Sequence, residues 1–153
     1  MIVDVSTFLS ADPGGVESHL KTSRLLMYVA APLIRFTPGA DHPLPEIWEE
    51  STYWVSMHLL GFIPLGKQAV VISYPAIKTG FSIRDNGYSK LIRKWDHRIT
   101  IESSGSGTLY RDHVIVDAGV LTVFVWAFAQ LFYRHRQRRW RRLVANGFSY
   151  PGS

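Results

Sequence analysis

The chain has 153 residues, of which 46% are hydrophobic and 19% charged, and its mean hydropathy is +0.02. This balance excludes an intrinsically disordered chain and a polytopic membrane protein, and the length suits one ordinary domain. The net charge is +5, and the absence of cysteine excludes disulfides, thiolate nucleophiles and zinc sites built on sulfur.

The positive charge is concentrated near the C-terminus. The arginines of this stretch are Arg134, Arg136, Arg138, Arg139, Arg141 and Arg142. Without them, the remaining basic and acidic residues nearly cancel. The basic character therefore belongs to one segment, which argues against a nucleic-acid-binding face spread over the domain.

The first part of the chain predicts a strand, a helix and a loop. Residues 2–9 are rich in β-branched and aromatic residues, which is typical of a strand. They lack the basic start and the unbroken apolar run of a secretory signal, so we expect a cytoplasmic protein. Asp12 and Pro13 precede a predicted helix over residues 16–27, and the prolines and glycine in residues 37–45 predict a loop.

The middle of the chain predicts consecutive antiparallel strands. Aromatic and β-branched residues from Ile47 onward favour one strand, and residues 68–74 favour a second. Residues 77–84 alternate between apolar and polar side chains, and Asp85-Asn86-Gly87 then predicts a tight hairpin turn. Residues 91–102 alternate again, Ser103–Gly107 predicts another turn, and residues 108–116 form the returning strand.

Residues 118–145 predict one long helix, apolar nearly all round in its first half and rich in arginine in its second. The apolar run, residues 118–133, is shorter than the roughly 20 residues that a membrane span needs. We therefore expect this helix to lie in the concave face of an antiparallel sheet, with a cavity between helix and sheet.

This order of elements resembles the START-like, Bet v 1-like helix-grip fold of the SRPBCC superfamily. The local match to its small bacterial members comprises Trp95-Asp96-His97-Arg98, Gly107-Thr108, Tyr110, Asp112, Val116, the link at Ala118-Gly119, and Tyr133-Arg134-His135-Arg136. Many small members have a proline near the start of the link, where this chain reads Asp117-Ala118-Gly119.

The resemblance implies an α+β domain in which a curved sheet wraps around the C-terminal helix. We expect this domain to span residues 1–146, with residues 147–153 as a short tail. The superfamily includes lipid carriers, polyketide cyclases and aromatases, so the resemblance also implies a deep pocket for an apolar or amphipathic molecule.

Aromatic residues are numerous, and we expect a sizeable fraction of them to line the pocket rather than fill the core. The set comprises Trp48, Trp54, Phe62, Phe81, Trp95, Tyr110, Phe124, Trp126, Phe128 and Phe132. The residues that we expect to contact the ligand are Trp54, Phe81, Trp95, His97, Tyr110, Asp112, Phe124 and Phe128.

Among these, His97 and Asp112 are the candidates for acid–base chemistry. The alternation of each strand places His97 with Trp95 and Ile99, and Asp112 with Tyr110, on the apolar face. A carboxylate on such a face is costly unless a partner satisfies it. The two side chains form either a structural polar pair or a ligand-contacting acid–base pair. If Asp112 points outward instead, Arg98 is its competing partner.

No metal site or cofactor is expected. The six histidines lack the close paired spacing of zinc ligands. The sequence contains no nucleophile elbow, phosphate loop or dinucleotide fingerprint, and Gly105-Ser106-Gly107 lies in a turn with no following helix to receive a phosphate.

Three functions remain open. The first is a non-catalytic protein that binds a hydrophobic small molecule or lipid in the cavity. The second is a polyketide cyclase- or aromatase-like enzyme, in which positioning of a reactive chain supplies much of the rate. The third is weak peripheral contact with an anionic membrane through the C-terminal arginines.

Overall fold

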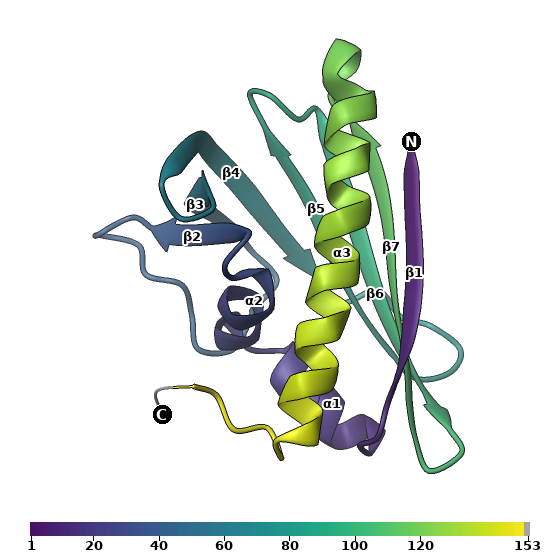
Figure 1. Cartoon of the computed structure of the whole chain (residues 1–153). Coiled ribbons are helices and arrows are strands. Elements are labelled where there is room, and N and C mark those ends of the chain that lie inside the picture. The colour runs from purple at the N-terminus through teal and green to yellow at the C-terminus, as the bar shows by residue number, and fades with distance from the viewer. Residues whose placement is uncertain (152–153) are drawn as a thin grey trace.

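The computed structural model describes residues 1–151. Its elements are β1 (Ile2–Leu9), α1 (Pro13–Leu20), α2 (Ser23–Ala30), β2 (Ile34–Pro38), β3 (Thr52–Leu59), β4 (Ile63–Ser73), β5 (Phe81–Ser89), β6 (Lys94–Ser104), β7 (Gly107–Asp117), a short 3-10 helix (Gly119–Leu121) and α3 (Thr122–Ala145). Within the described range, the seven strands form one curved antiparallel sheet in the order β1-β7-β6-β5-β4-β3-β2. Helix α3 crosses one face of the sheet, and α2 lies between α3 and β2 (Figure 1). The predicted α+β helix-grip architecture is confirmed.

The single helix predicted over residues 16–27 is two helices. Asp12 caps α1 by accepting a hydrogen bond from the Gly15 amide at 2.9 Å, and Thr22 caps α2 by accepting one from the Leu25 amide at 3.2 Å. A side chain that caps a helix satisfies amide groups that have no partner within the helix. Thr22 therefore starts a new helix where the apolar pattern alone indicated continuity.

The loop between β2 and β3 is shifted relative to the prediction. Residues 37 and 38 end β2, and the strand expected from Ile47 onward begins at Thr52. Trp48 lies outside a strand, but its side chain belongs to the buried core, and its amide donates to the carbonyl of Lys21 at 2.8 Å. This contact holds the loop against the start of α2.

The hairpin turn predicted at Asp85-Asn86-Gly87 is wrong, because these residues lie inside β5 and pair with β6. Asp85 opposes His97, and Gly87 opposes Trp95. The side chain of Asp85 accepts a hydrogen bond from the amide of Val71 on β4 at 2.8 Å, so it ties two strands together instead of closing a turn. Pairing with strands on both sides overrides the local turn preference of these residues.

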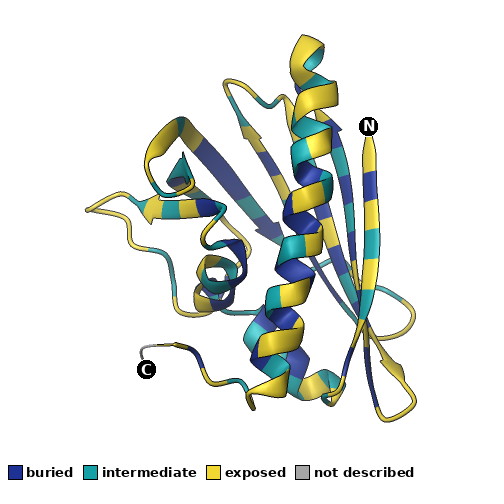
Figure 2. Cartoon of the chain, viewed as in Figure 1, coloured by how far each residue is buried: buried dark blue, intermediate teal, exposed yellow. Residues whose placement is uncertain are grey.

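Helix α3 buries a single stripe whose residues recur at intervals of three and four. The stripe comprises Ala129, Phe132, Tyr133, Arg136, Gln137, Trp140 and Leu143. The predicted position of the helix in the concave face of the sheet is correct, but its burial differs from the expectation. The 3-10 helix and the first turns of α3 project beyond the sheet, where Val120 is 96% and Phe124 75% exposed, and the arginine-rich half supplies four of the seven buried residues (Figure 2).

The C-terminal arginines consequently do not form one solvated cluster. Arg136 is buried, and Arg139 donates to the carbonyl of Tyr28 at 2.8 Å while lying over its ring. Arg138 and Arg142 are exposed. Within residues 1–151, no helix is long and apolar enough to cross a bilayer.

The segment expected as a tail packs back onto the fold over the residues that the structure describes. The ring of Phe148 stacks on His19 with centroids 4.2 Å apart, and Tyr150 is buried with its ring edge against Tyr28 at 5.3 Å. The last two residues of the expected tail, 152–153, lie outside the described range.

Replacing Gly87 by alanine tests the course of β5. A Cβ atom there would lie 2.6 Å from the carbonyl oxygen of Ala69 and 2.8 Å from Nε2 of Gln68, so β4 and β5 would have to move apart. We expect Gly87→Ala to lower the free energy of unfolding by about 1–3 kcal/mol in urea denaturation. Gly39→Ala is the control, because nothing lies within 4 Å of a Cβ there. Equal stability of the two variants would contradict the close approach of β4 and β5.

Candidate functional site

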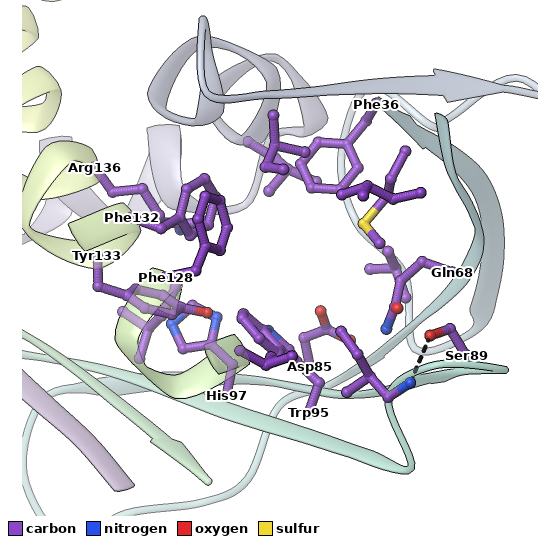
Figure 3. Close-up of a pocket in the computed structure, with 18 of the residues that line it drawn as sticks. Phe36, Gln68, Asp85, Ser89, Trp95, His97, Phe128, Phe132, Tyr133 and Arg136 are labelled. Carbon is purple, nitrogen blue, oxygen red and sulfur yellow. Dashed lines mark hydrogen bonds between the residues drawn. The ribbon is translucent and has the colours of Figure 1, made fainter. Parts of the chain in front are cut away.

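A cavity of about 400 Å³ lies between the concave face of the sheet, α2 and α3. Its wall is mostly apolar and is built from side chains of α2, α3 and strands β2 to β6 (Figure 3). The lining residues that carry a polar side-chain group are Thr22, Trp48, Gln68, Asp85, Ser89, Trp95, His97, Tyr133 and Arg136. The cavity therefore combines a large apolar surface with a small number of polar groups, as small-molecule sites usually do.

The cavity opens to solvent near the start of α3. Leu91, Leu121 and Phe124 all line the cavity, and each is also exposed on the outside of the molecule. Leu91 lies in the connection between β5 and β6, and Leu121 ends the 3-10 helix that precedes α3. We call these three residues the mouth of the cavity.

Four of the residues expected to contact a ligand line the cavity, namely Trp95, His97, Phe124 and Phe128. Phe128 stacks on Phe132 one turn further along α3, with ring centroids 5.8 Å apart. Their positions follow from strand alternation for Trp95 and His97, and from helical spacing for the two phenylalanines.

Trp54 and Phe81 lie outside the cavity wall. Trp54 sits on the opposite face of β3 from buried Val55, is half exposed, and packs edge-on against Tyr88 at 5.8 Å. Phe81 begins β5 and packs against Tyr74 at 5.8 Å. The aromatic character of a residue does not show whether its side chain faces the cavity or lies outside it.

Tyr110 and Asp112 lie behind the cavity wall, both with 0% exposure. The carboxylate of Asp112 lies at the centre of a hydrogen-bond network. Its Oδ1 lies 2.8 Å from Nε2 of His97 and accepts from the Tyr110 hydroxyl at 3.0 Å, and its Oδ2 accepts from Nε2 of Gln137 at 3.0 Å. The predicted meeting of His97 and Asp112 is therefore present. Arg98 is exposed on the other face of β6 and is not a partner.

The protonation states of this pair follow from its surroundings. Burial lowers the pKa of His97 despite the neighbouring carboxylate. Burial opposes the charge of Asp112 too, but the hydrogen bonds from His97 and Gln137 and the charge of Arg136 outweigh it and lower its pKa. Near neutral pH, a neutral His97 thus donates its Nε2 proton to an ionised Asp112, and Nδ1 keeps a lone pair that can accept a proton.

Sequence analysis missed six polar residues of the cavity wall: Thr22, Gln68, Asp85, Ser89, Tyr133 and Arg136. Asp85 was assigned to a turn, and Arg136 was grouped with the other arginines of the C-terminal segment. A signal for Arg136 does exist in the sequence, since it follows Phe132 by four residues on the same helical face. Gln68 is buried on β4 with no sequence pattern that separates it from an exposed glutamine.

Residues 1–151 contain no group of three or more histidine, aspartate or glutamate side chains close enough to hold an ion. His97 and Asp112 are a pair with no third such side chain beside them in that range.

Asp85 is the one carboxyl group among the described residues that line the cavity. Burial raises its pKa to about 7, against the opposing effects of the Val71 amide and of Arg136. At mildly acidic pH the side chain is therefore protonated in the folded protein, whereas it is ionised in the unfolded chain, where its pKa is about 3.8.

This difference makes stability depend on pH in a defined direction. The folded state binds more protons than the unfolded state between about pH 4 and 7, so the free energy of unfolding falls as pH rises through this window. Asp85→Asn keeps an acceptor for the Val71 amide and removes the charge. We expect urea denaturation to show the variant gaining stability relative to the wild type as pH rises, by at most about 4 kcal/mol.

Asp96→Asn is the matched control, with the opposite sign. A bidentate hydrogen bond from Arg84, at 2.7 and 2.8 Å, lowers the pKa of Asp96. The stability contributed by Asp96 is therefore present at neutral pH and lost as pH falls, so this variant is less stable than the wild type at pH 7 and the deficit shrinks on acidification. Parallel pH profiles for the Asp85→Asn variant and the wild type would contradict the assignment to Asp85.

Comparison with known proteins identifies the fold. No protein-family model and no curated protein matches the sequence. Among solved structures, TTHA0849 from Thermus thermophilus is similar at a TM-score of 0.69 and 12% identity, covering 97% of this chain and 100% of that one. A START superfamily protein from Mycobacterium smegmatis gives 0.62 and 15%, covering 95% and 97%, and Ara h 8.0201 gives 0.60 and 11%, covering 95% and 98%. The chain therefore has the START-like, Bet v 1-like helix-grip fold.

Proposed function

We propose that the protein binds an apolar or amphipathic small molecule in the cavity between the sheet and α3. The observation that carries the proposal is the cavity itself. Its volume of about 400 Å³ falls in the range of roughly 300–1,000 Å³ that is typical of small-molecule sites. Its wall consists largely of aliphatic and aromatic side chains.

The hydrophobic effect supplies the driving force for such binding. Transfer of apolar surface from water to the cavity contributes about 25 cal/mol for each Å² removed from water. The stacked rings of Phe128 and Phe132 offer flat surfaces on the side of α3, and Trp95 offers one on the side of the sheet. The START-like fold supports the same proposal, because its superfamily is one of ligand-binding domains.

Filling the cavity tests this proposal. Val70 lines the cavity from β4 and is 4% exposed, so Val70→Phe places a ring in the space that a ligand would occupy. We expect the wild type to bind the neutral dye N-phenyl-1-naphthylamine, with enhanced fluorescence, and Val70→Phe to weaken this binding about tenfold or more.

Val71→Phe is the matched control, since the next residue of β4 points to the other face of the sheet. It should bind the dye as the wild type does. Circular dichroism establishes that both variants are folded. Equal loss of binding in both variants, or absence of binding by the wild type, would refute the proposed function.

An enzyme is the second candidate, and the His97–Asp112 pair favours it. A neutral histidine that donates one ring proton to a carboxylate keeps its other nitrogen available as a general base. His97 lines the cavity, and Asp112 is held behind it by Tyr110 and Gln137. Such a pair could abstract a proton from a bound chain, which is the step that cyclisation or dehydration requires.

Ring opening of 5-nitrobenzisoxazole reports a general base in an apolar site without knowledge of the natural substrate. The base removes the carbon-bound proton, the N–O bond breaks, and a nitrile and a phenolate form. We expect saturable turnover by the wild type and a loss of about 100-fold in His97→Gln, whose amide still donates to Asp112. His19→Gln is the control, because His19 lies outside the cavity wall against Phe148. Equal rates for the wild type and His97→Gln would refute catalysis by His97 and leave ligand binding as the proposed function.

A further inference from the structure

Arg136 is a buried cation on the cavity wall. It lies on α3, is 5% exposed, and shares the inner face of the helix with Phe132 and Tyr133. Its guanidinium lies 5.8 and 5.4 Å from the centroids of these two rings. In Figure 3, Arg136 lies on the same side of the cavity as Phe132 and Tyr133, across the open space from Gln68 and Ser89.

The guanidinium group lacks the anionic partner that burial normally requires. None of the ion pairs within residues 1–151 includes Arg136, and its Nε has no hydrogen-bond partner there. The Tyr110 hydroxyl is its neutral polar neighbour. Burial of a charged group is costly unless the group is paired and hydrogen-bonded. The Nε–H of Arg136 therefore lacks an acceptor that a bound ligand would supply.

Asp112 does not supply this acceptor, although its charge favours the charged form of Arg136. Both carboxylate oxygens of Asp112 already have partners, with His97 and Tyr110 at Oδ1 and Gln137 at Oδ2. Its ion-pair contact within the described residues is with His97. Asp112 therefore balances the charge at a distance and leaves Nε of Arg136 free for another acceptor.

We propose that Arg136 recognises the carboxylate of an amphipathic acid whose apolar chain fills the rest of the cavity. This proposal rests on the proposed binding function and specifies the class of ligand. A guanidinium presents planar, forked donors that match a carboxylate. A single guanidinium group also suits a monoanion better than a doubly charged phosphate group.

The geometry of α3 gives the ligand an orientation. Phe124, at the mouth, lies 12 residues before Arg136, which is about 18 Å along a helix at 1.5 Å per residue. The exposed apolar side chains at the mouth and the charged group deep in the cavity make the two ends different. The acid group points inward and the apolar chain points towards Phe124.

A matched series of competitors tests this inference. Decanoate and decanol share a chain length and differ in charge, and each is titrated against the neutral dye bound to the full-length protein. We expect decanoate to displace the dye at a concentration about tenfold or more lower than decanol. In Arg136→Gln, decanoate should lose this advantage while decanol competes as it does with the wild type. Arg139→Gln is the control, since Arg139 lies on the same helix over Tyr28 and does not line the cavity.

The outcomes separate the inference from the proposed function. If decanol displaces the dye as well as decanoate does, the cavity binds apolar molecules and the carboxylate preference is refuted. If neither compound nor the dye binds, the proposed function fails as well. An advantage of decanoate that persists in Arg136→Gln would also overturn the role of Arg136.

A measurement on the wild type keeps the inference testable if Arg136→Gln does not fold. The carbon-13 resonance of carboxyl-labelled decanoate reports its ionisation while the acid is bound. Beside Arg136, the bound carboxyl should titrate at a lower pH than the free acid. Titration at a higher pH than the free acid would mean that the carboxyl lies in an apolar part of the cavity and would overturn the proposal.

Discussion

The carboxylate of Asp112 is fully buried, and a charge in that position is tolerated only with partners for both of its oxygens. Those partners come from β6 through His97, from β7 through Tyr110 and from α3 through Gln137. Gln137 also donates to the carbonyl of Val5 on β1 at 2.9 Å. The anion thereby joins β6 and β7 to the long helix, Gln137 adds β1, and together these contacts fix the position of the helix along the sheet. Every other side chain that α3 presents to the cavity depends on that alignment.

The same anion determines the electrostatics of the cavity. It lies behind the wall, so the groups that reach the cavity itself are a neutral His97, a charged Arg136 and Asp85, whose pKa lies near neutrality. The positive charge of the cavity is therefore located on α3, and the sheet side offers the neutral amide of Gln68 and the carboxyl of Asp85, which changes its charge near neutral pH. A ligand would meet an asymmetric environment, with different chemistry at the helix and at the sheet.

Much of the fold was predictable because alternation and helical periodicity report which face of an element is buried. The inward placement of His97 and Asp112 and the existence of α3 followed from such patterns. The assignment of Asp85 failed because its local preference for a turn was outweighed by pairing with β4 and β6, which involves residues distant in the sequence. Arg136 was missed because composition describes a segment as a whole, whereas burial on a helix differs from one residue to the next.

The mouth has a consequence for the kinetics of exchange. Leu91, Leu121 and Phe124 separate the cavity from solvent with side chains carried on a connection and at the start of a helix, away from the paired strands. Side chains in exposed positions change rotamer in picoseconds to nanoseconds, whereas separation of paired strands requires local unfolding. A ligand would thus enter and leave through the mouth without separation of the strands. Residence time would be governed by the strength of contacts inside the cavity rather than by the rate at which the protein opens.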